Sequence, residues 1–237
     1  MTLLTDLAAA LGPAHVLTGS DLARYTGDWT THYTANPVAV VRPADTEQVS
    51  QVMKIAAAHG VPVVPASGRT GLVGGAMTQG GLMLSVERLN RIREIRPNTR
   101  IAIVEAGVVL DRLHEAAEAQ NLYFPLWFGA RGSAMIGGVL STNAGGSNVL
   151  RYGSTRALCL GIEVVLADGS ILRTGMGSIE NGNTWQAFKW GYGPYLDGIF
   201  TQSNFGVVVK MGMWLMPRPP VYKPFVVRYA NVEDIAA

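Results

Sequence analysis

The sequence predicts an α+β fold in which a small parallel β–α–β part precedes a larger, mainly antiparallel sheet with helices. The first observation is a strand, a helix and a strand in succession between residues 38 and 64, the usual way to join two parallel strands. The second is the Asp168-Gly169 turn between two apolar runs, which favours an antiparallel hairpin. The third is a pair of glycine-rich loops, at 65–76 and 132–146, which suggests one long ligand lying between them.

The composition fits a well-buried enzyme domain. Of the 237 residues, 48% are apolar and 15% are charged, and the formal net charge is +2 without any basic run. This balance gives no support to nucleic-acid or membrane-surface binding. We expect no metal site. Cys159 is the single cysteine, which excludes a disulfide within the chain, favours a reducing compartment and indicates a small buried thiol. Because residues 1–11 lack a signal-peptide pattern and no apolar stretch reaches the ~20 residues of a membrane span, we expect a cytoplasmic protein.

The first half of the chain supplies the predicted parallel part. Leucines at helical spacing predict a helix over 3–11, which Gly12-Pro13 ends, and the apolar run 38–41 predicts a strand. Asp45 is placed as an N-cap with Gln48 reaching back to it, and apolar residues at helical spacing continue to Gly60. The run 61–64 then predicts a buried strand that leads into the first glycine loop.

The first glycine loop, Pro65 to Ala76, has the chemistry of a diphosphate site. Its glycines are expected to turn the backbone with positive φ, and successive free N–H groups in such a turn form a nest for anionic oxygens. Ser67, Arg69 and Thr70 add two hydroxyls and one cation. The alternative is a glycine-rich turn with no ligand. Neither loop has the GxGxxG spacing of a dinucleotide fingerprint or a Walker lysine, which disfavours a nicotinamide-binding Rossmann domain.

The second half supplies the predicted antiparallel sheet. Strands are expected at 81–86, 92–95 and 101–105, and a helix at 110–120 on which His114 is expected to lie at the surface. After the second glycine cluster, strands are expected at 161–166 and 171–174 around the Asp-Gly turn, at 207–215 and at 221–229. We expect four segments: a lead-in over 1–37, a first cofactor subdomain over 38–106, a second over 107–218, and the start of a further domain over 219–237.

Three stretches together resemble one family of flavoenzymes. They are Val40 to Pro43 with the following helix, the loop from Ser67 to Gly75, and the run from Thr142 to Gly146. In this order they resemble the FAD-linked oxidases whose flavin domain is of the p-cresol methylhydroxylase type, over residues 38–217. Up to Thr174 the amino-acid sequence is most similar to those of D-lactate dehydrogenases and of the flavin subunit of glycolate oxidase. From Gly175 onward it is more similar to vanillyl-alcohol oxidase and p-cresol methylhydroxylase.

The resemblance implies FAD and assigns it a set of binding residues. Ser67 to Gly71 would hold the diphosphate, the second glycine cluster would pass along the flavin, and the start of the 207–215 strand would meet the adenine. The implied set is Pro65, Ala66, Ser67, Gly68, Arg69, Thr70, Gly71, Gly75, Gly132, Ser133, Ile136, Gly137, Gly138, Thr142, Asn143, Gly145, Gly146, Tyr152, Gly206, Val207 and Val208. Arg69 stands where some relatives carry a flavin-linked histidine, so we expect FAD to be non-covalent. Residues 128–131 lack the acidic residue of vanillyl-alcohol oxidase.

The expected activity is oxidation of a D-2-hydroxy acid such as D-lactate, glycolate or D-2-hydroxyglutarate. Alternatives are oxidation of a para-substituted phenol, for which Tyr192 and Tyr195 could line a site, and a flavin-binding fragment or subunit without its own turnover. Arg131 is a candidate for binding a substrate carboxylate, against the simpler reading that it pairs with phosphate or solvent. The family's cap domain would begin where the chain ends. The sequence does not identify the electron acceptor, nor whether the chain assembles with a partner subunit or with a second copy of itself.

Overall fold

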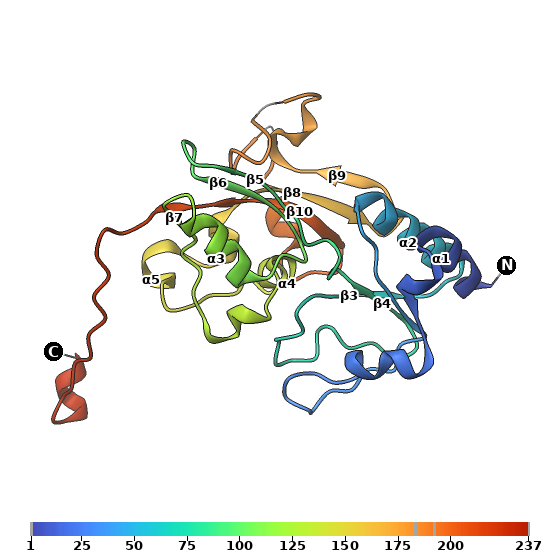
Figure 1. Cartoon of the computed structure of the whole chain (residues 1–237), viewed down its shortest axis with the longest axis horizontal. Coiled ribbons are helices and arrows are strands. Elements are labelled where there is room, and N and C mark those ends of the chain that lie inside the picture. The colour runs from blue at the N-terminus through green and yellow to red at the C-terminus, as the bar shows by residue number, and fades with distance from the viewer. Residues whose placement is uncertain (1, 183, 192, 237) are drawn as a thin grey trace.

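The structure is a computed structural model that describes residues 2–182, 184–191 and 193–236, and it contains two main sheets (Figure 1). The smaller sheet has the order β1-β2-β4-β3, with β1 at Val16–Leu17, β2 at Ala39–Val41, β3 at Val63–Ala66 and β4 at Leu82–Ser85. Strands β2 and β3 both pair in parallel with β4, and β1 is antiparallel to β2. The predicted parallel β–α–β part is therefore confirmed, with β4 lying between the two strands that the helix connects.

Helix α2, Thr46–Ala58, makes this crossover, and its ends follow from the sequence. The Asp45 carboxylate accepts a hydrogen bond from the Gln48 N–H at 2.8 Å, which caps the first turn. The Gln48 side chain accepts from the N–H of Ala44 rather than from that of Asp45, so the reciprocal half of the predicted capping box is displaced by one residue. Gly60 follows the helix with a φ of 64°, as its position predicts. Helix α1, Leu3–Leu11, packs beside α2.

The larger sheet is antiparallel throughout and has the order β5-β6-β10-β8-β9. Its bounds are Ile92–Arg96 for β5, Ile101–Glu105 for β6, Cys159–Leu166 for β8, Ile171–Arg173 for β9 and Gly206–Trp214 for β10. Strands β8 and β9 form the hairpin that the Asp-Gly turn predicts, and Gly169 has a φ of 81°. Strand β10 lies between β6 and β8, so a strand from late in the sequence forms the centre of the sheet.

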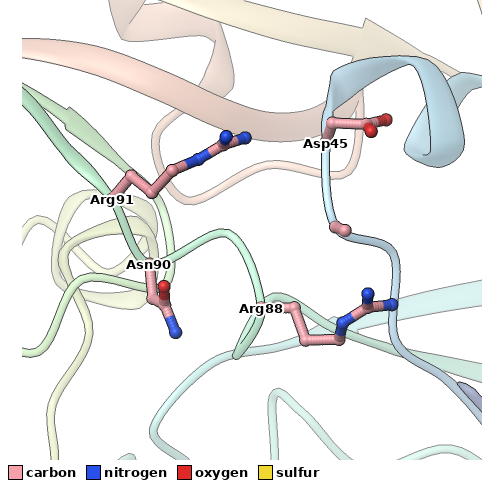
Figure 2. A pocket seen from close by; sticks show the side chains of 5 residues that line it. Asp45, Arg88, Asn90 and Arg91 are labelled. Atoms are coloured by element: carbon pink, nitrogen blue, oxygen red, sulfur yellow. The ribbon is translucent and has the colours of Figure 1, made fainter.

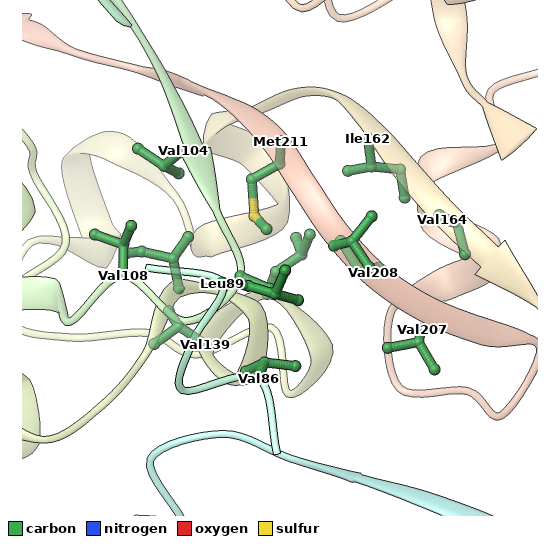
Figure 3. Close-up of a cluster of buried hydrophobic side chains, with 14 of the residues drawn as sticks. Val86, Leu89, Val104, Val108, Val139, Ile162, Val164, Val207, Val208 and Met211 are labelled. Atoms are coloured by element: carbon green, nitrogen blue, oxygen red, sulfur yellow. The ribbon is translucent and has the colours of Figure 1, made fainter. Parts of the chain in front are cut away.

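Helices lie on one face of the larger sheet (Figure 1). They are α3 at Leu110–Glu118, α4 at Ile136–Ser141, α5 at Val149–Tyr152 and α6 at Thr155–Leu158, and β7 at Leu122–Tyr123 pairs with β11 at Met216–Pro217. Short 3₁₀ turns occur at Pro13–His15, Gly19–Tyr25, Gly129–Gly132, Gly175–Ser178, Asp197–Phe200 and Val232–Ala236. Figure 3 shows the resulting core, in which Val104, Met211 and Ile162 of the sheet gather with Val139 of α4 and with Val86 and Leu89 of the β4–β5 connection.

One expectation about the chain's organisation was wrong, and the subdomain bounds stay a prediction. No strand forms over residues 221–229 among the described residues. This segment leaves the body as an extended tail whose Val221, Phe225 and Val226 side chains are exposed (Figure 1). The predicted first subdomain, 38–106, includes β5 and β6, which pair within the larger sheet. We therefore propose that the boundary between the two cofactor subdomains lies in the β4–β5 connection.

Among the described residues, none of the helices combines the length and the apolar character that a membrane crossing requires.

Candidate functional site

The two glycine loops are in direct contact, although about 65 residues separate them in the sequence. A Cβ atom at Gly68 would overlap the carbonyl oxygen of Ser133 and would lie 2.9 Å from its carbonyl carbon. On the other side of the contact, a Cβ at Gly138 would lie 2.8 Å from the Cβ of Ser67. Each loop therefore needs a glycine where it meets the other, and the two loops are joined by a close backbone contact.

The second glycine cluster is held against the end of β6. The N–H of Gly137 donates to the carbonyl of Ala106 at 2.7 Å, and the N–H of Ile136 donates to that of Val108 at 2.9 Å. A Cβ at Gly137 would lie 2.7 Å from the Cβ of Ala106, so this approach also requires glycine. Helix α4 is thereby anchored to the larger sheet, whereas the loop that it meets belongs to the smaller one.

The first loop presents unpaired hydrogen-bond donors. Within the described part of the chain, the backbone N–H groups of residues 68–73 donate to no protein acceptor, and the Ser67 and Thr70 hydroxyls form no hydrogen bond. Gly71 and Gly75 have no atom within 4 Å of their Cβ positions, so one side of the loop is open. A row of free N–H and O–H donors on an open glycine turn is the arrangement that binds phosphate oxygens. These residues fit a diphosphate.

The reason that this loop contains glycine differs from the expected one. Only Arg69 and Gly74 have positive φ in it, at 52° and 69°, and Gly68 and Gly71 lie outside the left-handed region. The expectation that these two glycines turn the chain with positive φ was therefore wrong. Gly68 is required by its contact with the second loop, and the place of Gly74 is tight as well, since its Cβ would lie 2.7 Å from the Tyr33 ring.

Arg69 is engaged with the N-terminal segment. Its Nη1 donates to the carbonyl of Arg24, and its guanidinium carbon lies 4.9 Å from the centroid of the Tyr25 ring. Burial lowers the pKa of Arg69, and the neighbouring positive charge of Arg24 lowers it further. The cation expected to serve the diphosphate thus makes its contacts with residues 24 and 25.

The end of the second cluster is shaped by packing. Asn143, with a φ of 49°, accepts hydrogen bonds at its Oδ1 from the Ser154 hydroxyl at 2.8 Å and the Arg156 N–H at 2.9 Å, and the Thr142 hydroxyl donates to the carbonyl of Gly138 at 3.0 Å. The Asn143 side chain thus holds the cluster to the start of α6, and the Thr142 side chain bonds within the cluster. The two glycines that follow are close to neighbours, because a Cβ at Gly146 would overlap the carbonyl oxygen of Trp127 and one at Gly145 would lie 2.8 Å from Val149.

The remaining predicted cofactor residues lie in regular structure. Gly206, Val207 and Val208 begin β10 and pair with Leu166, Val165 and Val164 of β8. A Cβ at Gly206 would lie 2.5 Å from a methyl group of Val164, so the close pairing of β10 with β8 is enough to explain why this position is a glycine. Tyr152 ends α5 and has the Arg151 guanidinium carbon 5.3 Å from its ring centroid. Their contact with a cofactor stays a prediction.

Arg131 forms an ion pair that the sequence did not reveal. Its Nε lies 2.7 Å from Oδ1 of Asp111, and its guanidinium carbon lies 4.1 Å from the centroid of a Trp127 ring, which itself stacks on His114 at 4.9 Å. His114 is buried, and its Nε2 lies 2.9 Å from the carbonyl oxygen of Leu126, so its predicted surface position was wrong.

Of the two candidate phenol-site residues, Tyr195 is partly exposed, with its pKa raised by burial, and Tyr192 lies outside the described residues.

A separate cavity of about 380 Å³ lies between the start of α2 and the β4–β5 connection (Figure 2). It is lined by Ala44, Asp45, Arg88, Asn90 and Arg91, which include none of the predicted cofactor residues. Its two arginine side chains already have protein partners: Arg88 donates to the carbonyl of Arg42, and Arg91 forms an ion pair with Glu105. The glycine-loop junction therefore stays the candidate site.

The chain is similar to one family of known proteins and to several individual proteins. A family described as FAD binding domain matches residues 37–175. The flavoprotein subunit of 4-cresol dehydrogenase (hydroxylating) from Pseudomonas putida is 43% identical over 202 residues, covering 84% of this chain and 39% of that protein. D-2-hydroxyglutarate dehydrogenase from Xanthomonas citri pv. viticola is 40% identical over 202 residues, covering 85% and 41%. The solved structure of p-cresol methylhydroxylase with substrate bound has a TM-score of 0.78 at 34% identity, covering 92% of this chain and 44% of that chain.

The chain thus spans about two fifths of the length of these curated relatives.

Proposed function

The chain belongs to the FAD-binding domain family, and on that premise we propose that it is the flavin-binding portion of an oxidoreductase, with the FAD diphosphate held by Ser67 to Gly71. The observation that carries this assignment is the row of unpaired backbone N–H groups over residues 68–73, in a loop with open space beside Gly71 and Gly75. A diphosphate would accept hydrogen bonds from these donors.

The residues around the loop would fix the cofactor's direction. The contact between Gly68 and Ser133 ties the diphosphate loop to the second glycine cluster, so a molecule bound at the first loop would continue along the second. When bound, FAD supplies the redox chemistry, and the protein's part is to hold and orient it. Arg69 offers no side chain that could bond covalently to flavin, and we propose that FAD is held non-covalently by these residues.

For the substrate of the longer protein, we propose a D-2-hydroxy acid. The support is the 40% identity to D-2-hydroxyglutarate dehydrogenase, together with the resemblance of the sequence up to Thr174 to D-lactate dehydrogenases. Arg131 would need to leave Asp111 or share its charge to bind a substrate carboxylate, which makes it a weak candidate for that role. The second candidate is a para-substituted phenol, favoured by the 43% identity to the 4-cresol dehydrogenase subunit. That relative is a subunit, which supports a partner chain for this one as well.

A substitution at Gly71 tests the diphosphate site. Because a Cβ at Gly71 meets no protein atom within 4 Å and its φ is not in the left-handed region, Gly71→Val should leave the apo fold and its melting temperature unchanged. The added side chain would occupy the open side of the loop, so FAD affinity should fall by about tenfold or more. Gly27→Val is the matched control, since Gly27 is equally open and lies outside both loops. Unchanged FAD affinity in Gly71→Val would place the diphosphate elsewhere.

A further inference from the structure

Tyr25 lies in the N-terminal lead-in, ahead of the residues 37–175 that match the family, yet it contacts the diphosphate loop. It ends the 3₁₀ turn Gly19–Tyr25 and is 2% exposed. Its ring lies 4.9 Å from the Arg69 guanidinium carbon, and the carbonyl of the preceding residue, Arg24, accepts a hydrogen bond from Arg69. One short segment therefore makes both contacts of the Arg69 side chain.

Arg69 needs such contacts because of its backbone. Its φ of 52° lies in the left-handed region, which costs a residue with a side chain about 1–2 kcal/mol relative to the right-handed one. A conformation of this kind persists only where its surroundings hold it. The residues on either side, Gly68 and Thr70, belong to the row of free donors, so the direction of those N–H groups depends on the turn at Arg69.

Tyr25 is itself held firmly. Its hydroxyl donates to the carboxylate of Glu87, at 3.1 Å from each oxygen. The same carboxylate accepts from Arg24 at 2.8 Å and from Arg42 at 3.2 Å. Glu87 follows β4 and Arg42 follows β2, so the tyrosine is fixed to the ends of these two neighbouring strands. Of the two, β4 also pairs with β3, which leads into the loop.

Positive charges outnumber negative ones in the network around Tyr25. Arg24 and Arg42 pair with the single carboxylate of Glu87, and the guanidinium group of Arg69 lies over the Tyr25 ring beside them. The surplus of positive charge next to the loop would favour an anionic ligand there, in addition to the donors of the backbone.

We propose that Tyr25 is a positioning residue for the cofactor: it braces the Arg69 side chain so that the diphosphate loop keeps its binding conformation. This inference rests on the proposed diphosphate site. It assigns a role in FAD binding to one residue of the N-terminal lead-in, Tyr25, and it gives Arg69 an indirect role, through the backbone, in place of direct contact with phosphate.

A double-mutant cycle on FAD affinity tests the proposal, with the dissociation constant measured by equilibrium dialysis of the flavin-free 237-residue chain. Tyr25→Leu should weaken FAD binding by about tenfold, as expected when a desolvated cation–π contact is lost. Tyr25→Phe keeps the ring and should weaken binding less. Glycine adopts positive φ without a brace, so Arg69→Gly should bind FAD within a few-fold of the parent chain. Adding Tyr25→Leu to Arg69→Gly should then cost less than about twofold.

Trp185 provides the matched control, because its ring lies 5.3 Å from the Arg173 guanidinium carbon and 5.1 Å from the Lys210 ammonium group, over the larger sheet. Trp185→Leu should lower the melting temperature and leave FAD affinity unchanged. The proposal is overturned if Tyr25→Leu has no effect, if its effect is as large in the Arg69→Gly background, or if Trp185→Leu weakens FAD equally. A large loss in Arg69→Gly would also overturn it, by showing direct contact. Gly71→Val separates failure of this proposal from failure of the diphosphate site. If Tyr25→Leu and Gly71→Val both retain FAD, the proposed diphosphate site is wrong. If Tyr25→Leu retains FAD and Gly71→Val loses it, the diphosphate site stands and only the proposed role of Tyr25 is wrong.

Discussion

The carbonyl oxygen of Ser133 occupies the space that a Cβ atom at Gly68 would need. Gly68 follows β3 of the smaller sheet, and Ser133 precedes α4, which packs on the larger one. The contact therefore joins the two sheets at the point where both glycine loops begin. A ligand that lies along both loops depends on this close approach, and on that of Gly138 to Ser67, for the relative position of the loops.

We predict that Gly68→Ala destabilises the chain and lowers its FAD content. The new methyl group must displace the Ser133 backbone, and overpacking of this kind costs about 1–3 kcal/mol. Gly71→Ala, in the same loop but facing open space, should leave the free energy of unfolding nearly unchanged. Urea denaturation of both variants without FAD measures the difference. Equal stability of Gly68→Ala and the parent chain would show that the two loops are not in contact.

We predict that FAD leaves this chain when the protein is denatured. Arg69 cannot form the covalent link that a histidine makes at this place in some relatives, and its side chain contacts Arg24 and Tyr25. After acid precipitation of the yellow protein, the colour should remain in the supernatant. Colour that stays with the pellet would mean that another residue of the chain bonds to the flavin.

The regular elements of this fold could be predicted because their signals are local. The capping residue Asp45, the apolar spacing that follows it and the Asp168-Gly169 turn lie within the elements that they define. The burial of His114 was also within reach, since it continues the spacing of Leu110, Leu113 and Ala117 on the buried face of α3.

The details of the site could not be read in the same way, because they depend on contacts between distant residues. The contact of Arg69 with Tyr25 joins two segments 44 positions apart, so the sequence shows a cation in a loop but not the residue that it contacts. The requirement for glycine at position 68 comes from Ser133, and the partner of Arg131 is Asp111 on another element. The apolar run 221–229 predicts a strand by composition, yet a strand also needs a neighbouring chain with which to pair.

The substrate class can be tested on a longer protein that contains this chain. If the proposed D-2-hydroxy acid is the substrate, anaerobic D-lactate or D-2-hydroxyglutarate should bleach the flavin absorbance within a turnover, with the L-enantiomers as controls. Bleaching by a 4-alkylphenol without bleaching by the hydroxy acids would favour the phenol reading, in line with the 4-cresol dehydrogenase relative.

Glu163 links helix α2 to the larger sheet, and its charge should make stability depend on pH. Its side chain is 3% exposed and accepts hydrogen bonds from Arg173 at 2.9 Å and from Thr46 of α2 at 2.8 Å, with the Lys210 ammonium at 3.2 Å. Burial alone would raise the pKa of Glu163, but these three partners together hold it below its ordinary value of 4.5.

A carboxyl group whose folded-state pKa is lowered contributes stability above its ordinary pKa, and this contribution is lost as the pH falls through the folded value. Glu163→Gln should therefore lower the free energy of unfolding by about 1–3 kcal/mol near neutral pH, and its difference from the parent chain should shrink as the pH falls below 4.5.

Glu94→Gln is the control. The pKa of Glu94 is lowered by its hydrogen bond to Arg96, but its side chain is 46% exposed, so the loss should stay below about 1 kcal/mol. Denaturant titrations at neutral and acidic pH compare the variants. A difference for Glu163→Gln that is the same at every pH would show that the residue acts through packing, and that its charge does not hold α2 to the sheet.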